Sequence, residues 1–299
     1  MFINIMKEAK LYQKLKEKRL KCLACSNECI ISNGKKGICG VRKNINGKLQ
    51  LLVHGMPCAV HVDPIEKKPL YHFLPGSLAF SIGTIGCNFK CPWCQNWDIS
   101  QNRDENFFSK ELLTPKKAVS LAILYGCKSI AYTYNEPAIF SEYIKDIAKL
   151  AKKEGLKNIL VTNGYFTKES FDFLNKEHLI DAANIDLKAF KDETYRKYCG
   201  SVKGIKPVLE NIKRFHKAKI HIEVTTLIIP NLNDSKKELK QIAEFIASID
   251  KNIPWHISRY FPQYKMDEKK HPVTKIETLK LAEKIGKATG LRYVYIGNV

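Results

Sequence analysis

Three cysteines lie within eight residues of this chain, and no other feature constrains its fold so strongly. The segment from Cys87 to Cys94 has a C-x₃-C-x₂-C spacing with Cys91 in the middle, and it follows the apolar stretch Leu78–Ile85. Short apolar stretches of this kind are typical of buried strands. The spacing therefore predicts three thiols on one loop after a strand, close enough to bind a single metal centre.

The number of thiols limits the kind of centre that they can form. A closed zinc site takes four ligands, an ordinary [4Fe–4S] cluster takes four thiolates, and the next cysteine along the chain is the distant Cys127. Three thiolates therefore predict a [4Fe–4S] cluster with one open iron, which can bind a small molecule. The alternative is a zinc site that a distant histidine or cysteine completes, because short cysteine patterns do not transfer safely between families.

A second group of cysteines lies nearer the N-terminus, at Cys22, Cys25, Cys29 and Cys39. The segment around them is rich in glycine and has little hydrophobic periodicity, so it cannot build a core of its own. We expect a bound metal to hold it as a small knuckle. Zinc is the usual metal for four cysteines in a short structural element, and an auxiliary iron–sulfur cluster is the alternative.

The chain has 299 residues, of which 44% are apolar, and it can bury one large core. We expect two parts, with residues 1–75 as an N-terminal helix, the cysteine knuckle and a connector, and residues 76–299 as an α/β domain. No apolar run reaches the length of about 18 residues that a membrane-spanning helix needs, and no signal peptide is recognisable. Ten cysteines in such a chain indicate metal binding in a reducing cytoplasm.

The formal net charge is +20, from 50 basic and 30 acidic residues. The bias is strongest at the N-terminus, where the first 50 residues contain 12 basic and 3 acidic residues. Such a bias favours an anionic partner, such as RNA, an acidic protein surface or a phosphorylated substrate. The alternative is a solvated, lysine-rich surface, because no arginine cluster with interleaved aromatic residues indicates base reading.

Two segments before residue 76 have patterns of their own. We expect a short helix over residues 5–20, where the spacing of Leu11 and Leu15 would place both on one face. The proline-rich stretch from Asp63 to Gly76 predicts an extended connector into the second part of the chain.

From residue 77 onward, short apolar stretches alternate with helical patterns, and this order predicts a parallel sheet that curls toward a barrel. We expect an incomplete (β/α)₆ barrel. The predicted strands are Leu78–Ile85, Ser129–Asn135, Asn158–Thr162, Ala182–Leu187, Ile220–Ile229, Trp255–Tyr260 and Arg292–Ile296. The helices between them have start signals at Thr114, Thr167, Ser235 and Thr274.

Polar side chains recur at the ends of the predicted strands. In a parallel β/α barrel, functional residues collect at the C-terminal ends of strands, so we expect these side chains to form one ring. Asp186 and Lys188 alternate along one strand end and would face the same side. The candidate residues of the ring are Asn135, Glu136, Thr162, Asn163, Asp186, Lys188, Glu223, Thr225, His256 and Ser258.

These motifs, in this order, resemble a known family over residues 19–299. The chain is similar to the radical SAM member of the AmmeMemoRadiSam system, a branch of the radical S-adenosylmethionine (SAM) superfamily close to the activating enzymes of pyruvate formate-lyase and other glycyl-radical enzymes. The stretches that carry the resemblance include Cys22–Cys39, Asp63–Leu70, Cys94-Gln95-Asn96-Trp97, Tyr134-Asn135-Glu136-Pro137, Asp186–Phe190 and Pro254–Pro262.

The resemblance implies roles for single residues. Cys87, Cys91 and Cys94 would ligate the cluster. Tyr134-Asn135-Glu136-Pro137 takes the place of the family's Gly-Gly-Glu motif, in which the glutamate binds the amino group of SAM. The other residues with implied roles at SAM are Trp93 near the adenine, Thr162 and Asn163 in the pocket wall, Asp186 and Lys188 near the methionine carboxylate, and His256.

The resemblance also implies an activity. SAM would be cleaved reductively at the [4Fe–4S] cluster, and the resulting 5′-deoxyadenosyl radical would abstract a hydrogen atom from a substrate. A reductant such as ferredoxin or flavodoxin would supply the electron. The substrate is either a glycyl-radical-type protein or, since the chain is strongly basic, an RNA or a small molecule.

Overall fold

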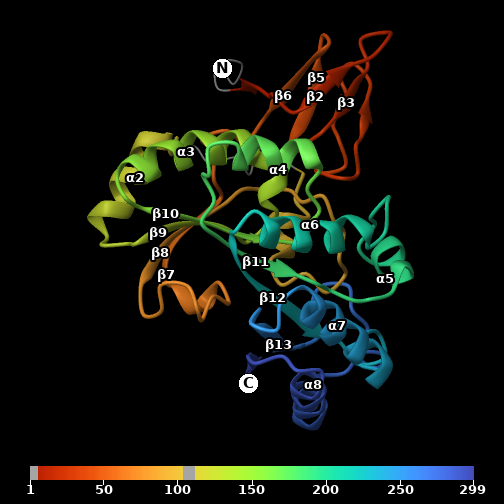
Figure 1. Ribbon diagram of the computed structural model, residues 1–299. Helices are drawn as coiled ribbons and strands as arrows, with labels where there is room; N and C mark the ends of the chain where they lie inside the picture. Colours follow the sequence, from red (N-terminus) through yellow and green to blue (C-terminus); the bar gives the residue numbers. More distant parts are fainter. Residues whose placement is uncertain (1–5, 104–111) are drawn as a thin grey trace.

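The structure is a computed structural model that describes residues 6–103 and 112–299, and its central element is an eight-stranded sheet (Figure 1). The strands are β7 (Ala59–Pro64), β8 (Leu78–Gly83), β9 (Ser129–Tyr132), β10 (Lys157–Thr162), β11 (Ala182–Asp186), β12 (His221–Ile228), β13 (Trp255–Arg259) and β14 (Val294–Gly297). Their order across the sheet is β14-β13-β12-β11-β10-β9-β8-β7. Strands β8 to β14 pair in parallel, and β7 pairs antiparallel with β8 at one edge. All seven predicted strands are confirmed, because these apolar stretches suit strands buried on both faces.

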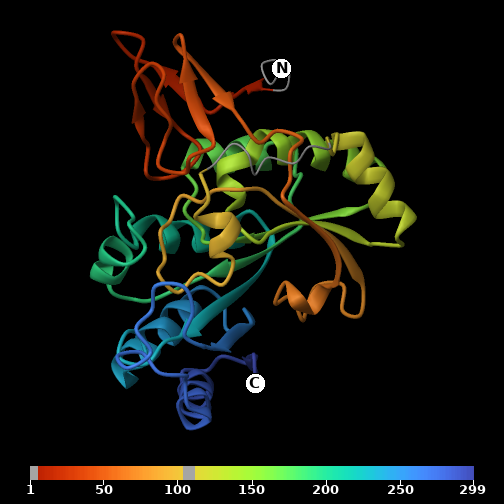
Figure 2. The same cartoon turned by 180° about the vertical axis from the view of Figure 1, so that it is seen from behind.

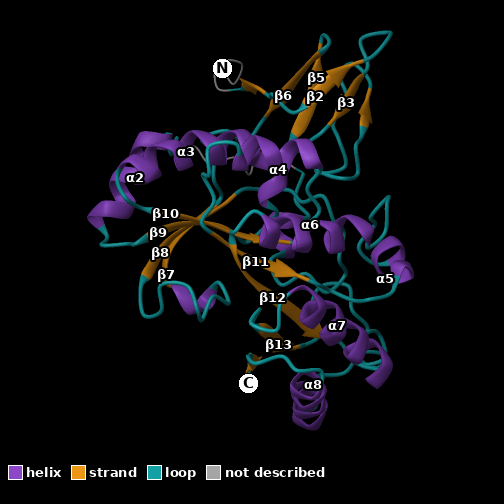
Figure 3. Cartoon of the chain, in the orientation of Figure 1, coloured by secondary structure: helices purple, strands orange, loops and turns teal. Residues whose placement is uncertain are grey.

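Helices follow the parallel strands and lie along the sheet, from α2 and α3 near β8–β10 to α7 and α8 near β12 and β13 (Figures 1 and 3). They are α1 (Trp97–Ser100), α2 (Pro115–Leu124), α3 (Ser141–Lys153), α4 (Lys168–Asn175), α5 (Asp192–Lys197), α6 (Lys206–Lys217), α7 (Lys236–Ile249) and α8 (Ile276–Ala288). The predicted caps Thr114, Thr167 and Ser235 are confirmed, since each accepts a backbone N–H of the first turn. The prediction for Thr274 is wrong. Lys275 is the N-cap of α8, and the Thr274 hydroxyl instead donates to the Ile228 carbonyl.

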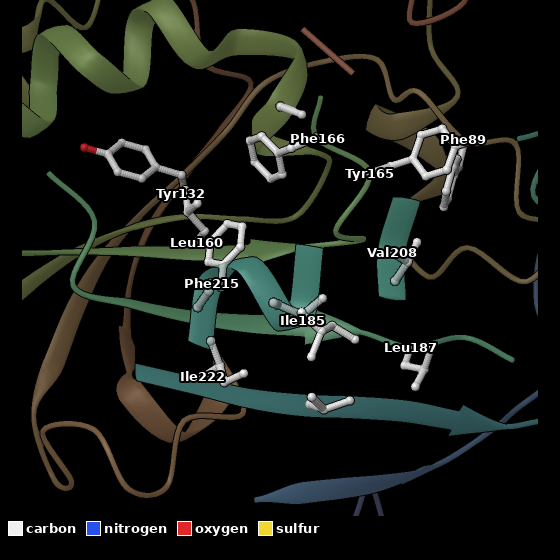
Figure 4. Close-up of a cluster of buried hydrophobic side chains, with 14 of the residues drawn as sticks. Phe89, Tyr132, Leu160, Tyr165, Phe166, Ile185, Leu187, Val208, Phe215 and Ile222 are labelled. Atoms are coloured by element: carbon white, nitrogen blue, oxygen red, sulfur yellow. The ribbon is translucent and has the colours of Figure 1, made fainter. Parts of the chain in front are cut away.

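The main hydrophobic core fills the space between the sheet and these helices. Figure 4 shows Phe89, from the cysteine loop, beside Tyr165, and the two ring centroids are 4.9 Å apart. Leu160 and Ile185 from the sheet and Phe215 from α6 pack in the same cluster. The cysteine loop is therefore anchored in the core by a large aromatic side chain.

The helix predicted over residues 5–20 is wrong. In the described part of this segment, from residue 6 onward, the chain forms short strands that pair with distant residues, as in the pairing of Lys7 with Leu51. Glu17 and Lys18 have φ angles of 57° and 54°, which a right-handed helix does not contain. Tertiary pairing therefore overrides the helical pattern. The strands form two small sheets, β1-β6-β5 and β2-β3-β4, from β1 (Lys7–Glu8), β2 (Tyr12–Lys14), β3 (Leu20–Cys22), β4 (Ile30–Ile31), β5 (Arg42–Ile45) and β6 (Lys48–Leu51).

The expected boundary between the two parts of the chain lies at residue 76. Strand β7 lies before this boundary and yet forms the edge of the main sheet. The segment that was expected to be extended contains a 3₁₀ helix, η1 (Ile65–Lys67), and Figure 2 shows this segment from behind, beside the main sheet. The prolines of this segment suggested an extended chain, but Pro64 in fact starts a helical turn.

A buried ion pair joins the N-terminal sheets to the main domain. Arg42 on β5 and Glu142 on α3 form a bidentate pair, with an exposed fraction of 1% and 3% of their side chains. Arg42 Nε also donates to the Ile139 carbonyl at 2.8 Å, and Glu142 accepts the backbone N–H of Lys10 at 2.9 Å and of Leu11 at 3.3 Å. Burial favours the neutral acid, but the Arg42 guanidinium outweighs it and lowers the pKa of Glu142.

Within the described residues, none of the helices is both long and apolar enough to cross a membrane.

The substitution Glu142→Gln should lower the free energy of unfolding by roughly 3–5 kcal/mol, because it leaves the Arg42 guanidinium buried without a counter-charge. Urea unfolding followed by circular dichroism measures this change. The control is Glu154→Gln at the exposed end of α3, which should stay within about 0.5 kcal/mol of the wild type. A loss of less than about 1 kcal/mol for Glu142→Gln would contradict the role of this pair.

Candidate functional site

The cysteine loop starts where β8 ends, and its path depends on close contact with the N-terminal sheets. Gly86 has φ of 84°, and a Cβ atom at this position would lie 2.4 Å from the Cys39 carbonyl oxygen. Only glycine fits here, because the backbone is left-handed and another chain segment is in contact. On the other side, Lys90 N donates to the Cys199 carbonyl at 2.8 Å. The loop is thus held between two distant segments.

The three thiols of the loop have separate hydrogen-bond partners. Cys94 Sγ lies 3.1 Å from Ser100 Oγ, Cys87 Sγ donates to Asn88 Oδ1 at 3.6 Å, and Cys91 forms a hydrogen bond with the thiol of Cys199. Burial raises the pKa of Cys87 well above its usual value, and the other two thiols of the loop are close enough to add to this effect.

The four N-terminal cysteines also lie close to one another. Burial raises the pKa of Cys25, and the charges of Cys22, Cys29 and Cys39 act in the same direction. In neither cysteine group, and nowhere else among residues 6–103 and 112–299, do three His, Cys, Asp or Glu side chains stand ready in a metal-binding geometry. Rotation of the thiols away from their present partners would be needed to join them at one metal.

A buried side-chain amide on the cysteine loop fits an iron–sulfur cluster. Asn88 lies between Cys87 and Cys91, and its Nδ2 atom is buried without an acceptor among the described residues. The rest of this side chain is fixed, since Asn88 Oδ1 accepts Asn163 Nδ2 at 2.7 Å. A buried N–H donor on the loop that carries the three thiols suits the sulfur atoms of a cluster, which are stabilised by hydrogen bonds.

Asn135 holds the end of β9 against the start of the cysteine loop. Its Nδ2 donates to Thr84 Oγ1 at 2.8 Å and to the Gly86 carbonyl at 2.9 Å, and its Oδ1 accepts Thr84 N at 3.2 Å. The amide is therefore occupied by the protein itself. Asn135 borders the pocket described below, but its observed role is to position the loop.

Glu136 is a buried carboxylate at the centre of the site, with an exposed fraction of 1%. It accepts Ala138 N at 2.9 Å, Thr162 Oγ1 at 2.7 Å and Asn163 N at 2.8 Å. These bonds fix its orientation, but burial dominates and raises the pKa of Glu136 to about 7. A cationic ligand beside this carboxylate would stabilise its charged form.

Asp186 and Lys188 face the same side at the end of β11, as their alternation predicted, and they form an ion pair. The Lys188 Nζ atom lies 2.8 Å from Asp186 Oδ2, and Tyr195 accepts the Lys188 backbone N–H at 3.0 Å. Burial disfavours the ammonium, yet the neighbouring Asp186 carboxylate outweighs it, so the pKa of Lys188 lies well above its usual value. Lys188 is therefore a cation held in place next to the thiols of Cys91 and Cys199.

One pocket of about 330 Å³ brings most of the predicted site residues together. It is lined by the three thiols of the loop and by strand-end residues of β9 to β13. Its lining includes these predicted residues: Cys87, Cys91, Cys94, Trp93, Asn135, Glu136, Thr162, Asn163, Asp186, Lys188, Thr225 and Ser258.

Glu223 and His256 are not among the residues that line this pocket, and the expected role of His256 at SAM stays a prediction. His256 Nε2 lies 2.6 Å from Glu223 Oε2, and the His256 ring packs edge-on against Tyr71. Glu223 also accepts the backbone N–H groups of Tyr71 at 3.1 Å and His72 at 2.8 Å. These two residues occupy earlier positions on β12 and β13, where they anchor the segment that follows η1.

The sequence analysis assigned no role to four residues at the site. Lys68 and Tyr134 line the pocket, and Asp63 Oδ2 accepts Lys68 Nζ and the Tyr134 hydroxyl, each at 2.6 Å. Cys199, whose thiol contacts Cys91, comes from the loop after α5. A signal for the first group existed, because Asp63 and Lys68 lie in a stretch that carried the family resemblance. Nothing in the spacing of Cys199 indicated its position.

Comparisons with known proteins agree with this geometry. Residues 81–246 match the radical SAM superfamily. An uncharacterized protein of Methanocaldococcus jannaschii is 42% identical over 295 residues, which cover 98% of this chain and 86% of the relative. A second protein of that organism, named a putative glycyl-radical enzyme activating enzyme, is 32% identical over 181 residues, covering 59% of this chain and 65% of its own length.

A solved structure supports the fold over nearly the whole chain. The crystal structure of a radical SAM methyltransferase from Sphaerobacter thermophilus matches with a TM-score of 0.59 and covers 98% of this chain and 77% of its own. The sequence identity is 12%, so this likeness concerns the fold alone.

The buried Glu223 generates a pH prediction. Although burial favours the neutral acid, hydrogen bonds from His221, His256 and two backbone N–H groups lower the pKa of Glu223 from 4.5 to about 2. A lowered carboxyl pKa stabilises the fold above the unfolded pKa, and this contribution, roughly 3 kcal/mol, disappears as the pH falls from about 5 towards 2.

The measurement compares the free energy of unfolding of the wild type with that of Glu223→Gln from pH 7 downward. The difference should be largest at pH 7 and should shrink below about pH 5. The control variant Glu210→Gln changes an exposed carboxylate on α6 and should give a small difference that does not depend on pH. A difference for Glu223→Gln that stays constant down to the lowest pH at which the wild type folds would be inconsistent with the lowered pKa.

Proposed function

The chain belongs to the radical SAM superfamily, and we propose that it cleaves SAM reductively at a [4Fe–4S] cluster bound by Cys87, Cys91 and Cys94. The observation that carries this proposal is the single pocket in which these thiols lie beside Glu136 and Lys188. When bound, the cluster supplies one electron to the sulfonium of SAM, which yields methionine and a 5′-deoxyadenosyl radical that abstracts a hydrogen atom.

The side chains of the pocket suit the charged groups of SAM. The Glu136 carboxylate would bind the amino group, because a carboxylate pairs with an ammonium. Thr162 and the Asn163 N–H orient that carboxylate through the bonds described above. The Lys188 ammonium, fixed by Asp186, would neutralise the methionine carboxylate.

Two aromatic residues of the cysteine loop line the pocket. Trp93 is buried, with an exposed fraction of 4%, and would pack near the adenine. Phe89 is also buried, so both rings exclude water from the region around the thiols. Water exclusion protects a radical from side reactions. We assign no general acid or base, since the first bond cleavage transfers no proton.

We infer that the main sheet is an incomplete barrel of six β/α units. The units run from β8 through α8, and β14 follows as the last strand. In the described residues the outermost strands, β7 and β14, lie at opposite ends of the strand order. We also assign the chain to the AmmeMemoRadiSam branch, on the motifs Tyr134-Asn135-Glu136-Pro137 and Cys94-Gln95-Asn96-Trp97.

The identity of the substrate has two candidate answers. A glycyl-radical-type protein is supported by the name of a relative, the putative activating enzyme. An RNA or a small molecule is supported by the net charge of +20. In either case the electron would come from a small redox protein such as ferredoxin or flavodoxin.

Anaerobic reconstitution with iron and sulfide should give about four iron atoms per chain at the cysteine loop. After reduction with dithionite in the presence of SAM, we expect 5′-deoxyadenosine, which liquid chromatography detects. Cys91→Ala should abolish both the cluster absorbance and the product. The control Cys127→Ala, at a buried thiol outside both cysteine groups, should retain both. Product formation by Cys91→Ala at the wild-type rate would refute the assignment.

The four N-terminal cysteines should bind a separate metal, and we propose zinc. We expect about one zinc per chain by elemental analysis, lost in Cys25→Ala and retained in Cys127→Ala. If a variant that lacks Cys87, Cys91 and Cys94 still binds about four iron atoms after reconstitution, the N-terminal site holds an auxiliary cluster and the zinc assignment is wrong.

A further inference from the structure

Lys67 and Lys68 line the pocket, both pair with Asp63, and no proposed role at SAM uses these charges. We propose that Lys67 and Lys68 bind an anionic group, a carboxylate or a phosphate, of a small-molecule substrate. This inference rests on the proposed radical SAM function and identifies the class of its substrate.

Lys68 is a buried ammonium with unused donors. Its residue has an exposed fraction of 3%, and its Nζ donates to Asp63 Oδ2 at 2.6 Å. An ammonium has three N–H donors. Among the described residues Asp63 is the one hydrogen-bond acceptor for Nζ, which also lies over the Tyr134 ring, 4.7 Å from its centroid. The side chain lines the pocket, where a ligand can reach the remaining donors. A buried charge is costly unless its hydrogen bonds are satisfied, so a ligand acceptor would stabilise this group.

The balance of charge at this end of the pocket selects an anion. Asp63 faces two ammonium groups, since Lys67 Nζ lies 3.7 Å from Asp63 Oδ1. The same carboxylate also accepts the Tyr134 hydroxyl at 2.6 Å, so its acceptor capacity is largely used within the protein. One carboxylate against two ammonium groups leaves an excess positive charge. A carboxylate or phosphate is the ligand that such a pair recognises.

The backbone fixes the two lysines on both sides. Before them, η1 starts at a bond from Ile65 N to the Ser77 carbonyl, and Lys68 N closes the turn on the Ile65 carbonyl, both at 2.9 Å. After them, the Pro69 carbonyl accepts Asn184 Nδ2 at 2.8 Å. Next along the chain, Glu223 holds two backbone N–H groups of the same segment. Two ammonium groups on such a fixed turn form a preorganised site, which reduces the entropic cost of binding.

Tyr134 relates this site to the cysteine loop. Its carbonyl accepts Asn96 Nδ2, just after the cysteines, at 2.9 Å, while its hydroxyl contacts Asp63. Tyr134 therefore contacts both the carboxylate that pairs with the lysines and the segment after the cysteines. An anion held at Lys68 would bind in the same pocket as the proposed cluster and SAM, where the hydrogen atom would be abstracted.

Burial favours a small molecule over a macromolecule. Lys68 is 3% exposed and lines the pocket, so a ligand reaches its ammonium only from inside that pocket. The phosphates of a nucleic acid backbone lie along a broad surface and contact exposed cations. A small anion, in contrast, can enter the pocket and reach Lys68.

The test uses the full chain, reconstituted anaerobically and reduced with dithionite in the presence of SAM. An extract of deuterium-grown cells is separated into protein, RNA and small molecules, and the small molecules are divided on an anion-exchange resin. Mass spectrometry measures deuterium in 5′-deoxyadenosine. We expect deuterium to be transferred into 5′-deoxyadenosine from the small molecules that the resin retains. Loss of this transfer after phosphatase treatment identifies a phosphate, and its persistence identifies a carboxylate. Deuterium from the protein, the RNA or the unretained small molecules alone would overturn the proposal.

Variants of the lysines connect the transfer to this site. Lys68→Met should raise the amount of retained fraction needed for half-maximal transfer about tenfold or more, since a charge-assisted hydrogen bond is lost. Lys68→Arg, which keeps the charge, should raise it less. Lys67→Met, at a side chain with 69% exposure, should fold normally and raise it about threefold. The control Lys240→Met changes an exposed lysine on α7 and should leave it unchanged.

The outcomes separate the two levels of inference. If no fraction yields 5′-deoxyadenosine, the proposed radical SAM function fails, and the subsite fails with it. If 5′-deoxyadenosine forms but takes no deuterium from the retained fraction, only the subsite is wrong. Unchanged half-maximal amounts in both Lys67→Met and a folded Lys68→Met would also reject the subsite. Circular dichroism and the urea midpoint show whether Lys68→Met is folded, and if it is not, Lys67→Met decides.

Discussion

The parallel pairing of β8 to β14 is the constraint on which the rest of the structure depends. Parallel strands have their C-terminal ends at one edge of a sheet, so residues far apart in the sequence, such as Glu136 and Lys188, line one pocket. The cysteine loop follows the first of these strands and therefore lies at the same edge. No local feature of the loop could place it beside a carboxylate and a lysine without this pairing.

Three buried carboxylates show how the fold compensates charge in different ways. Glu142 is paired with a guanidinium, and Glu223 is surrounded by two imidazoles and two backbone N–H groups, so each is stabilised as an anion. Glu136 has only neutral donors, and its pKa stays raised. The first two stabilise the fold as anions, whereas the negative charge of Glu136 has no cationic partner among the described residues. This difference in compensation distinguishes the proposed binding residue from the other two.

The sequence predicted those parts of the molecule that local patterns of residues determine. The seven strands and the caps Thr114 and Thr167 follow from apolar periodicity and turn chemistry, and Glu136 and Lys188 follow from their places at strand ends. It failed where long-range contacts decide. Strand β1 pairs with β6, far along the chain, and His256 forms a hydrogen bond with Glu223 of the neighbouring strand that no local pattern indicates. Lys68 was missed because a connector has no periodicity that indicates which side chain points inward.

The contact between Gly86 and the Cys39 carbonyl has a consequence for dissecting the protein into fragments. The two cysteine-containing segments approach each other closely through their backbones, so each forms part of the surface on which the other packs. A fragment that began at residue 76 would lose the edge strand β7, the turn with Lys67 and Lys68, and the surface against which the cysteine loop is packed. The boundary suggested by motif content and the boundary of the working unit are therefore different, and only the longer unit contains a complete pocket.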